Sequence, residues 1–181
     1  MPKVVVSEYD PCWPETFQAL RARVSAAVGD TAIAIEHIGS TSVPGLSAKP
    51  IIDLTVVVAG PAEIQVCIQK LARIGYEHRG NLGVEGREAF RSPPNLPKHH
   101  LYACPNGSLG LRNHLAVRDY LRANATASAE YGKLKTELAT RFPNDIDSYI
   151  EGKTEFLLEV LRRSGLTPSE MTSISQSNRK D

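Results

Sequence analysis

The sequence predicts an α+β domain, with a mixed β-sheet packed by helices and a helical C-terminal half. Two apolar segments, residues 31–38 and 51–58, are rich in isoleucine, valine and alanine, as is typical of β-strands. From Ser108 onward, apolar residues recur at helical spacing instead. Strands that precede a run of helices favour an α+β architecture.

Size and composition are those of one globular domain. The chain has 181 residues, of which 41% are hydrophobic and 23% are charged, so it can bury a core without disulfides or metals. The net charge of +1 gives no strong indication of nucleic-acid binding. Any anion binding must therefore depend on a local cluster of charges.

The cysteines and the hydropathy pattern indicate a cytoplasmic protein. Cys12, Cys67 and Cys104 are widely separated and form no Cys-x-x-Cys pair, which argues against a disulfide framework and a zinc site. The first residues do not resemble a secretory leader, and no apolar run approaches the length that crosses a bilayer. We therefore expect no membrane partner.

The first half of the chain is expected to alternate between helices and strands. Residues 4–6 are a candidate edge strand, and Pro14 suits the first turn of a helix, where its missing N–H is not needed. The almost wholly apolar segment 51–58 is typical of a strand that is buried on both faces. Pro61 starts a second helix. Further strands are expected over residues 88–91 and 99–104, after a loop rich in glycine.

The second half is expected to contain three helices, the last of them capped by Asn144 or Asp145. From Ser164 to Asp181 the sequence is polar and rich in serine, so we expect a disordered tail. The predicted organisation is a single domain over residues 1–163 and a tail over residues 164–181.

The loop between the first two strands concentrates the candidate chemistry. It begins with Gly39-Ser40-Thr41-Ser42 and contains Lys49. Consecutive N–H groups of small residues can bind an anion, and the hydroxyls and the lysine add donors. The alternative is a tight connection whose hydroxyls bond to their own backbone. Because a carboxylate, Asp53, follows directly, we favour anion binding.

Asp53 has two interpretations of its own. A carboxylate within an apolar strand must be paired or must bind a cation. Mg²⁺ takes one or two carboxylates together with water and substrate phosphate, so Asp53 is the candidate metal ligand and Mg²⁺ the candidate cofactor. The alternative is a structural salt bridge to Lys49 or Arg118.

Two pairs of neighbouring residues each offer one side chain to the site, because side chains alternate along a strand. In the first pair, Glu36 is a candidate second ligand or base, whereas His37 could equally be a buried, hydrogen-bonded residue. In the second pair, His100 shares its parity with Tyr102, and we place both toward the site. There, His100 could act as a general base or bind phosphate or metal, and His99 would point away.

Basic residues of the helical half are candidate phosphate ligands. Arg118 and Arg122 lie four residues apart on one helix and face the same way. Together with Lys135 and Lys153 they would form a cationic wall opposite the loop. The alternative for each is a solvated surface charge.

These residues resemble the GrpB family. The similarity is carried by residues 35–46 and 48–53 and by shorter matches, among them His99-His100-Leu101 and residues 118–122, and it covers residues 9–163. The family is grouped with the nucleotidyltransferase fold and also occurs fused to dephospho-CoA kinase. The resemblance implies that Gly39-Ser40 holds a triphosphate and that Asp53 holds Mg²⁺.

Two positions depart from the family pattern. The usual Asp-x-Asp is here Asp53-Leu54-Thr55, so the second acid is missing. Its absence argues against two-metal chemistry. Where the family often has His-Leu-His, this chain has His100-Leu101-Tyr102. The difference argues against a role for a second histidine.

Three functions follow from these observations. The first is a nucleotidyltransferase-like protein that binds a nucleotide or another small phosphorylated ligand and catalyses Mg²⁺-dependent nucleotidyl transfer to an unknown acceptor. Its candidate catalytic residues are Asp53, His100 and Glu36, and its candidate phosphate ligands are Gly39, Ser40, Thr41, Ser42, Lys49, Arg118, Arg122, Lys135 and Lys153. The second is a ligand-binding module without turnover, which the missing acid favours. The third is a folding-accessory or assembly domain, which the kinase fusions suggest. The sequence does not indicate an oligomeric state.

Overall fold

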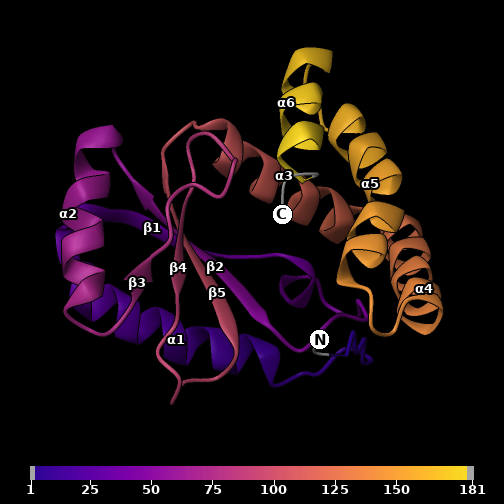
Figure 1. Cartoon of the computed structure of the whole chain (residues 1–181), viewed down its shortest axis with the longest axis horizontal. Helices are drawn as coiled ribbons and strands as arrows, with labels where there is room; N and C mark the ends of the chain where they lie inside the picture. The colour runs from indigo at the N-terminus through magenta and orange to yellow at the C-terminus, as the bar shows by residue number, and fades with distance from the viewer. Residues whose placement is uncertain (1–2, 179–181) are drawn as a thin grey trace.

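A five-stranded mixed sheet forms the centre of the molecule, which is a computed structural model that describes residues 3–178 (Figure 1). The strand order is β1-β2-β5-β4-β3, and only the β2–β5 pair is parallel. The strands are β1 (Ala32–Ile38), β2 (Ile52–Val58), β3 (Glu77–His78), β4 (Glu88–Arg91) and β5 (His99–Pro105). The predicted mixed sheet is therefore confirmed.

The two faces of this sheet are covered by different helices. Helices α1 (Trp13–Val28) and α2 (Pro61–Ala72) lie on one side, and the helices of the second half lie on the other (Figure 1). The side of α1 and α2 holds the main apolar core, which includes Val24, Leu54 and Leu101. Successive strand residues point to opposite faces, so the residues between these core positions face the second half of the chain.

The second half consists of helices, as predicted. They are α3 (Leu109–Ala123), α4 (Ala125–Arg141) and α5 (Ile146–Arg163). The Asp145 carboxylate accepts a hydrogen bond from the Ser148 N–H at 3.1 Å and caps α5. Two residues of the loop that follows β1, Val43 and Leu46, pack with Tyr131 of α4. This apolar contact holds the loop between the sheet and the helical half. Among the described residues, no helix is both long and apolar enough to cross a membrane.

The candidate edge strand at residues 4–6 is not present. The backbone pairs with the loop only through an isolated bridge from Ser7 to Ala48, while the Val4 N–H donates to the Pro143 carbonyl at 2.8 Å. Val4 is buried against Leu138 and Tyr149 of the helical half. Its side chain gains more contact there than a solvent-exposed sheet edge would offer.

The disorder expected after Ser164 is wrong for the described part of that segment, because the chain forms α6 (Pro168–Asn178). Leu166 and Ile174 are buried against Leu161 of α5. Thr167 and Glu170 form a capping box, in which the Thr167 N–H donates to the Glu170 carboxylate at 2.8 Å. The apolar contacts of Leu161, Leu166 and Ile174, together with this cap, dock α6 on α5. The predicted tail also includes residues 179–181, which lie outside the described residues.

Candidate functional site

A cavity of about 320 Å³ lies between the sheet, the loop after β1 and the helices α3, α4 and α5. Its lining is strongly cationic: among the described residues that line it, Asp53 is the only carboxylate, whereas the basic side chains are Lys49, Arg87, Arg118, Lys135 and Lys153. Most of the predicted site residues therefore meet in one place. Predicted residues in the lining are Gly39, Ser40, Thr41, Lys49, Asp53, His100, Arg118, Lys135 and Lys153.

Gly39 allows the loop to approach Asp53. Its φ of +67° lies in the region that favours glycine, and an added Cβ would lie 2.9 Å from the Asp53 Cβ and closer still to the carboxylate. The turn that follows, η2 (Ser40–Ser42), places Ser40 and Thr41 in the cavity wall. The Ser42 hydroxyl instead donates to the Gly39 carbonyl at 2.6 Å, which is the backbone-satisfying alternative for this residue.

Asp53 pairs with His100. The two residues lie opposite each other in the parallel register of β2 and β5, and the Asp53 Oδ1 is 2.7 Å from the His100 Nδ1. The side chain of Asp53 is 25% exposed and that of His100 is 50% exposed. The alternative salt bridge to Lys49 or Arg118 is wrong, because among the described residues the ion-pair partner of Asp53 is His100.

His37 of β1 and His99 of β5 are structural. His37 stacks on Phe17 with ring centroids 4.4 Å apart, and its Nε2 lies 3.1 Å from the Thr41 hydroxyl. Burial lowers the pKa of His37 to about 4, so its imidazole is neutral at pH 7. His99 is bonded to the Tyr76 hydroxyl and to the Pro97 carbonyl. Both side chains lie on the α1 side, as the alternation along the strands predicts.

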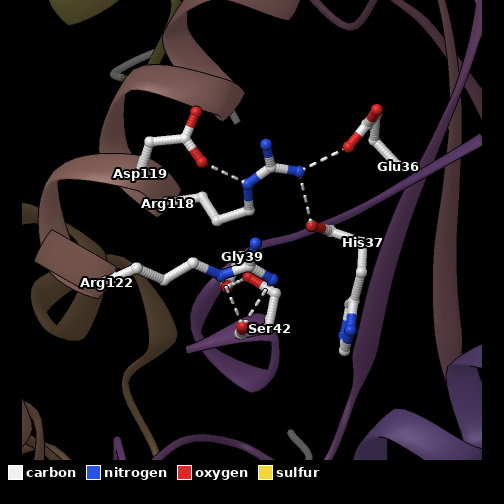
Figure 2. A network of polar contacts seen from close by, with 7 residues as sticks. All are labelled: Glu36, His37, Gly39, Ser42, Arg118, Asp119 and Arg122. Carbon is white, nitrogen blue, oxygen red and sulfur yellow. Dashed lines mark hydrogen bonds and ion pairs between the residues drawn. The ribbon is translucent and has the colours of Figure 1, made fainter. Parts of the chain in front are cut away.

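Arg118 and Arg122 attach α3 to the end of β1 and to the loop (Figure 2). Arg118 donates to the Glu36 carboxylate at 2.6 Å and to the His37 carbonyl at 3.2 Å. Arg122 donates twice to the Ser42 carbonyl, at 3.0 and 2.8 Å. These bonds hold the loop in its position.

The same bonds change the roles expected for three residues. Glu36 was expected as a second metal ligand or base, but its carboxylate is paired with Arg118. Glu36, Ser42 and Arg122 are absent from the described lining of the cavity. Their positions are those of residues that support the loop. The reason is the placement of α3, from which Arg122 bonds to the loop and Arg118, while lining the cavity, bonds to Glu36.

Lys135 of α4 and Lys153 of α5 line the cavity. Lys135 is only 2% exposed, and no described residue offers a hydrogen-bond partner to its Nζ, which lies 4.6 Å from the ring centroid of Tyr131. Lys153 lies 4.5 Å from the ring centroid of Tyr149, and Lys49 lies 5.7 Å from the same centroid. For Lys135 the alternative of a solvated surface charge is therefore wrong.

Burial and repulsion from neighbouring lysines lower the pKa values of Lys135 and Lys153. Burial, followed by the charge of Lys153, lowers the pKa of Lys135 to about 7. Burial, followed by the charge of Lys49, lowers the pKa of Lys153 to about 8. In both cases the carboxylate of Asp53 acts in the opposite direction. Buried ammonium groups without partners are rare in folded proteins unless they serve a function.

Arg87 and His114 line the same cavity and were not among the predicted site residues. Arg87 precedes β4 in the irregular segment of the sequence, where no periodicity indicates the direction of a side chain. His114 belongs to α3 and shares no motif with the loop. Tyr131 and Tyr149, which pack against the lysines, could have been noted because each precedes its lysine by four residues, one helical turn.

The residues present do not form a metal site by themselves. Among the described residues, no group of three or more histidine, cysteine, aspartate or glutamate side chains is arranged to hold a metal ion. Thr55, at the position of the missing acid, is fully buried and lies opposite Glu36 and Tyr102 in the sheet. Asp53 is thus a single carboxylate ligand, and Mg²⁺ would need most of its ligands from a bound molecule.

The family model described as "GrpB protein" matches residues 3–163. The chain belongs to the GrpB family. The UPF0157 protein YqkA of Bacillus subtilis is 37% identical over 155 residues, which are 86% of this chain but only 45% of YqkA. A dephospho-CoA kinase of Mycolicibacterium paratuberculosis is 25% identical over 180 residues, which are 86% of this chain and 44% of the kinase.

Solved structures confirm the predicted fold. The GrpB protein of Enterococcus faecalis superposes with a TM-score of 0.79 at 36% identity, with 88% of this chain and 96% of that chain covered. The MgGTP-bound Cid1 poly(U) polymerase superposes with a TM-score of 0.53 at 16% identity, with 75% of this chain and 45% of that chain covered. This GrpB-family chain therefore has a nucleotidyltransferase-like α+β fold.

Proposed function

We propose that the cavity binds the phosphate group of a small anionic ligand, and that Lys135 is the central contact. The observation that carries this proposal is the Lys135 ammonium group, which is 2% exposed and has no hydrogen-bond partner among the described residues. A phosphate oxygen would supply that partner and would offset the repulsion between Lys135 and Lys153.

The rest of the cavity suits the two ends of such a ligand. Lys49, Lys153 and the turn at Ser40 surround the position proposed for the phosphate. Val117, Leu121 and Leu157 add apolar surface to the lining, against which the body of the molecule could pack. A nucleotide or another phosphorylated metabolite has this combination of charged and less polar parts.

Nucleotidyl transfer is the second candidate. Its support is the position of Asp53 beside the Gly39 turn, on a nucleotidyltransferase-like fold. With one carboxylate and a buried threonine at position 55, the protein lacks the paired acids that two-metal chemistry uses. Binding without turnover is therefore the function that we favour. An assembly role, suggested by the relatives named dephospho-CoA kinase, is the third.

A comparison of lysine variants tests the proposal. Inorganic phosphate, pyrophosphate, ATP, CTP, GTP and CoA are titrated by calorimetry and by thermal shift, each with and without Mg²⁺ or Mn²⁺. We expect at least one of these probes to raise the melting temperature, because a ligand of the native state stabilises it. We expect Lys135→Met to weaken that probe by about tenfold or more, as the loss of a charge-assisted contact should.

Lys133→Met is the matched control. Lys133 lies on the same helix, but its side chain is 80% exposed and pairs with Glu137. Its removal should change the affinity by less than about twofold, as expected for a surface charge. If both variants bind equally well, the cavity is not the site. If no probe binds to the wild type, phosphate binding is rejected and the assembly role gains. If Asp53→Asn removes a shift that requires Mg²⁺, nucleotidyl transfer gains.

We further propose that the chain acts in the cytoplasm. Cys12 is an exposed free thiol, and Cys67 and Cys104 are buried free thiols. Exposed thiols without partners persist in reducing compartments. Fractionation of cells that produce the tagged chain would test the location, and recovery in an oxidising compartment would contradict it.

A further inference from the structure

Two further buried polar atoms without a described partner belong to residues that line the cavity, Arg87 and His114. The Arg87 Nε and the His114 Nδ1 are both buried, and neither has a hydrogen-bond partner among the described residues. Both residues line the same cavity as Lys135. Leaving two buried polar nitrogens unsatisfied is costly, so we expect a bound group to pair with them.

Arg87 is held in place by close packing of the backbone on α3. The Ser108 hydroxyl donates to the Gly86 carbonyl at 2.9 Å. A Cβ added to Gly86 would lie 2.7 Å from the Ser108 Cβ, and one added to Gly110 would lie 3.0 Å from the Arg87 Cβ. The two glycines thus let the segment before β4 rest on the first turn of α3. Arg87 enters the cavity from a fixed backbone.

The side chains around Arg87 fix its guanidinium group and keep His114 neutral. The Arg87 guanidinium lies 4.8 Å from the ring centroid of Tyr102, and the ring of His114 lies 5.3 Å from the same ring. Burial, followed by the charge of Arg87, lowers the pKa of His114 to about 4. At neutral pH this site therefore offers one positive charge and one uncharged imidazole.

We propose that Arg87 and His114 form a second oxyanion subsite, so that the ligand of this cavity carries two separated anionic groups. The planar guanidinium group matches the paired oxygens of a phosphate or a carboxylate. Sugar bisphosphates and phosphorylated acids belong to this class. This inference rests on the proposed phosphate site, because one anionic group is assigned to Lys135 and the other to Arg87.

Calorimetry with matched probes tests the second subsite. Glycerol 3-phosphate has one anionic group, 3-phosphoglycerate adds a carboxylate, and fructose 1,6-bisphosphate adds a second phosphate. We expect at least one of the latter two to bind the wild type about tenfold tighter than glycerol 3-phosphate, as expected for a second charge-assisted contact. Arg87→Gln should remove this advantage and leave the affinity for glycerol 3-phosphate within about twofold.

The controls separate a lost subsite from a lost fold. Arg91→Gln changes an arginine of β4 that is 61% exposed and pairs with Glu77, so it should keep the advantage of the two-anion probes. Arg87→Lys keeps the positive charge but not the paired N–H donors of the guanidinium group. It should remove part of the affinity advantage of the two-anion probes. Unliganded melting curves show which variants are folded, and if Arg87→Gln does not fold, Arg87→Lys decides.

Two results would overturn the inference while leaving the phosphate site intact. One is a wild type that binds glycerol 3-phosphate as tightly as both two-anion probes. The other is a folded Arg87 variant that weakens all three probes equally. A wild type that binds neither these three probes nor any probe used for the phosphate site would instead reject the phosphate site itself, and the second subsite with it.

Discussion

The two faces of the central sheet use the same strands for different purposes. Toward α1 and α2, β2 and β5 present Leu54, Val56 and Leu101, all of which are fully buried in the main core. Toward α3, the residues between them include Asp53 and His100, which pair beside the cavity. One face packs the main apolar core and the other presents polar side chains beside the cavity, so most of the stability of the sheet is supplied away from the site.

The histidine pair of β5 shows the same contrast at the level of neighbours. His99 is 4% exposed, and both ring nitrogens have protein partners. The side chain of His100 is half exposed and is bonded to Asp53. Residue type therefore does not decide the role of a histidine here. The direction in which the strand points it decides whether it belongs to the core or to the site.

The largest expected effect is on the core face. Leu54→Ala should lower the free energy of unfolding by about 3 kcal/mol, because it leaves a cavity in a packed interior. The affinity for the phosphate probe should remain within about twofold. His100→Ala, on the other face, should cost less than about 1 kcal/mol, as expected for a half-exposed pair. Urea unfolding and calorimetry measure both. A larger loss of stability for His100→Ala would contradict the division between the faces.

A fall in pH should lower the free energy of unfolding, because His37 on the core face has a lowered pKa in the folded state. Its pKa is about 4 in the folded state, against 6.5 for an ordinary histidine, so the unfolded chain binds more protons between these values. Stability is therefore lost as the pH falls from 6.5 to 4. From pH 7 to pH 5 this histidine should contribute a loss of about 2 kcal/mol.

His37→Gln should reduce that loss, because an amide keeps a polar contact to Thr41 but does not titrate. Urea unfolding at the two pH values provides the comparison. His114 also has its pKa lowered to about 4, so part of the acid sensitivity should remain in the variant. An unchanged pH dependence in His37→Gln would show that His37 does not titrate in this range.

The smallest expected effect is at the cavity, where the affinity for an anion should fall as the pH rises. Sulfate keeps its charge over this range and can stand in for phosphate. Lys135 and Lys153 have pKa values of about 7 and about 8, so they are charged at low pH and lose their protons as the pH rises. Sulfate affinity should fall by about tenfold between pH 6 and pH 8. Calorimetry on Lys135→Met should show a shallower fall, and a parallel one would exclude Lys135 from the site.

Much of the fold was predictable from short-range patterns. The apolar segments at residues 31–38 and 51–58, the helical spacing after Ser108 and the cap at Asp145 are all local in the sequence. The alternation along a strand also predicted that His100, and not His99, faces the site. Helix α6 forms although the composition of its segment is polar, and its capping box, Thr167-Pro168-Ser169-Glu170, is an equally local signal.

The sequence by itself determined the fold class, the loop beside Asp53 and the direction of each strand residue, because these depend on neighbours within a few positions. Only the tertiary structure decided the partners. Asp53 pairs with His100 across 47 residues, and Arg118 reaches Glu36 across 82. The tertiary structure also placed Arg87 in the cavity wall and left Lys135 buried, with no hydrogen-bond partner among the described residues. Such pairings depend on which elements pack together, and no local pattern in the chain specifies that packing.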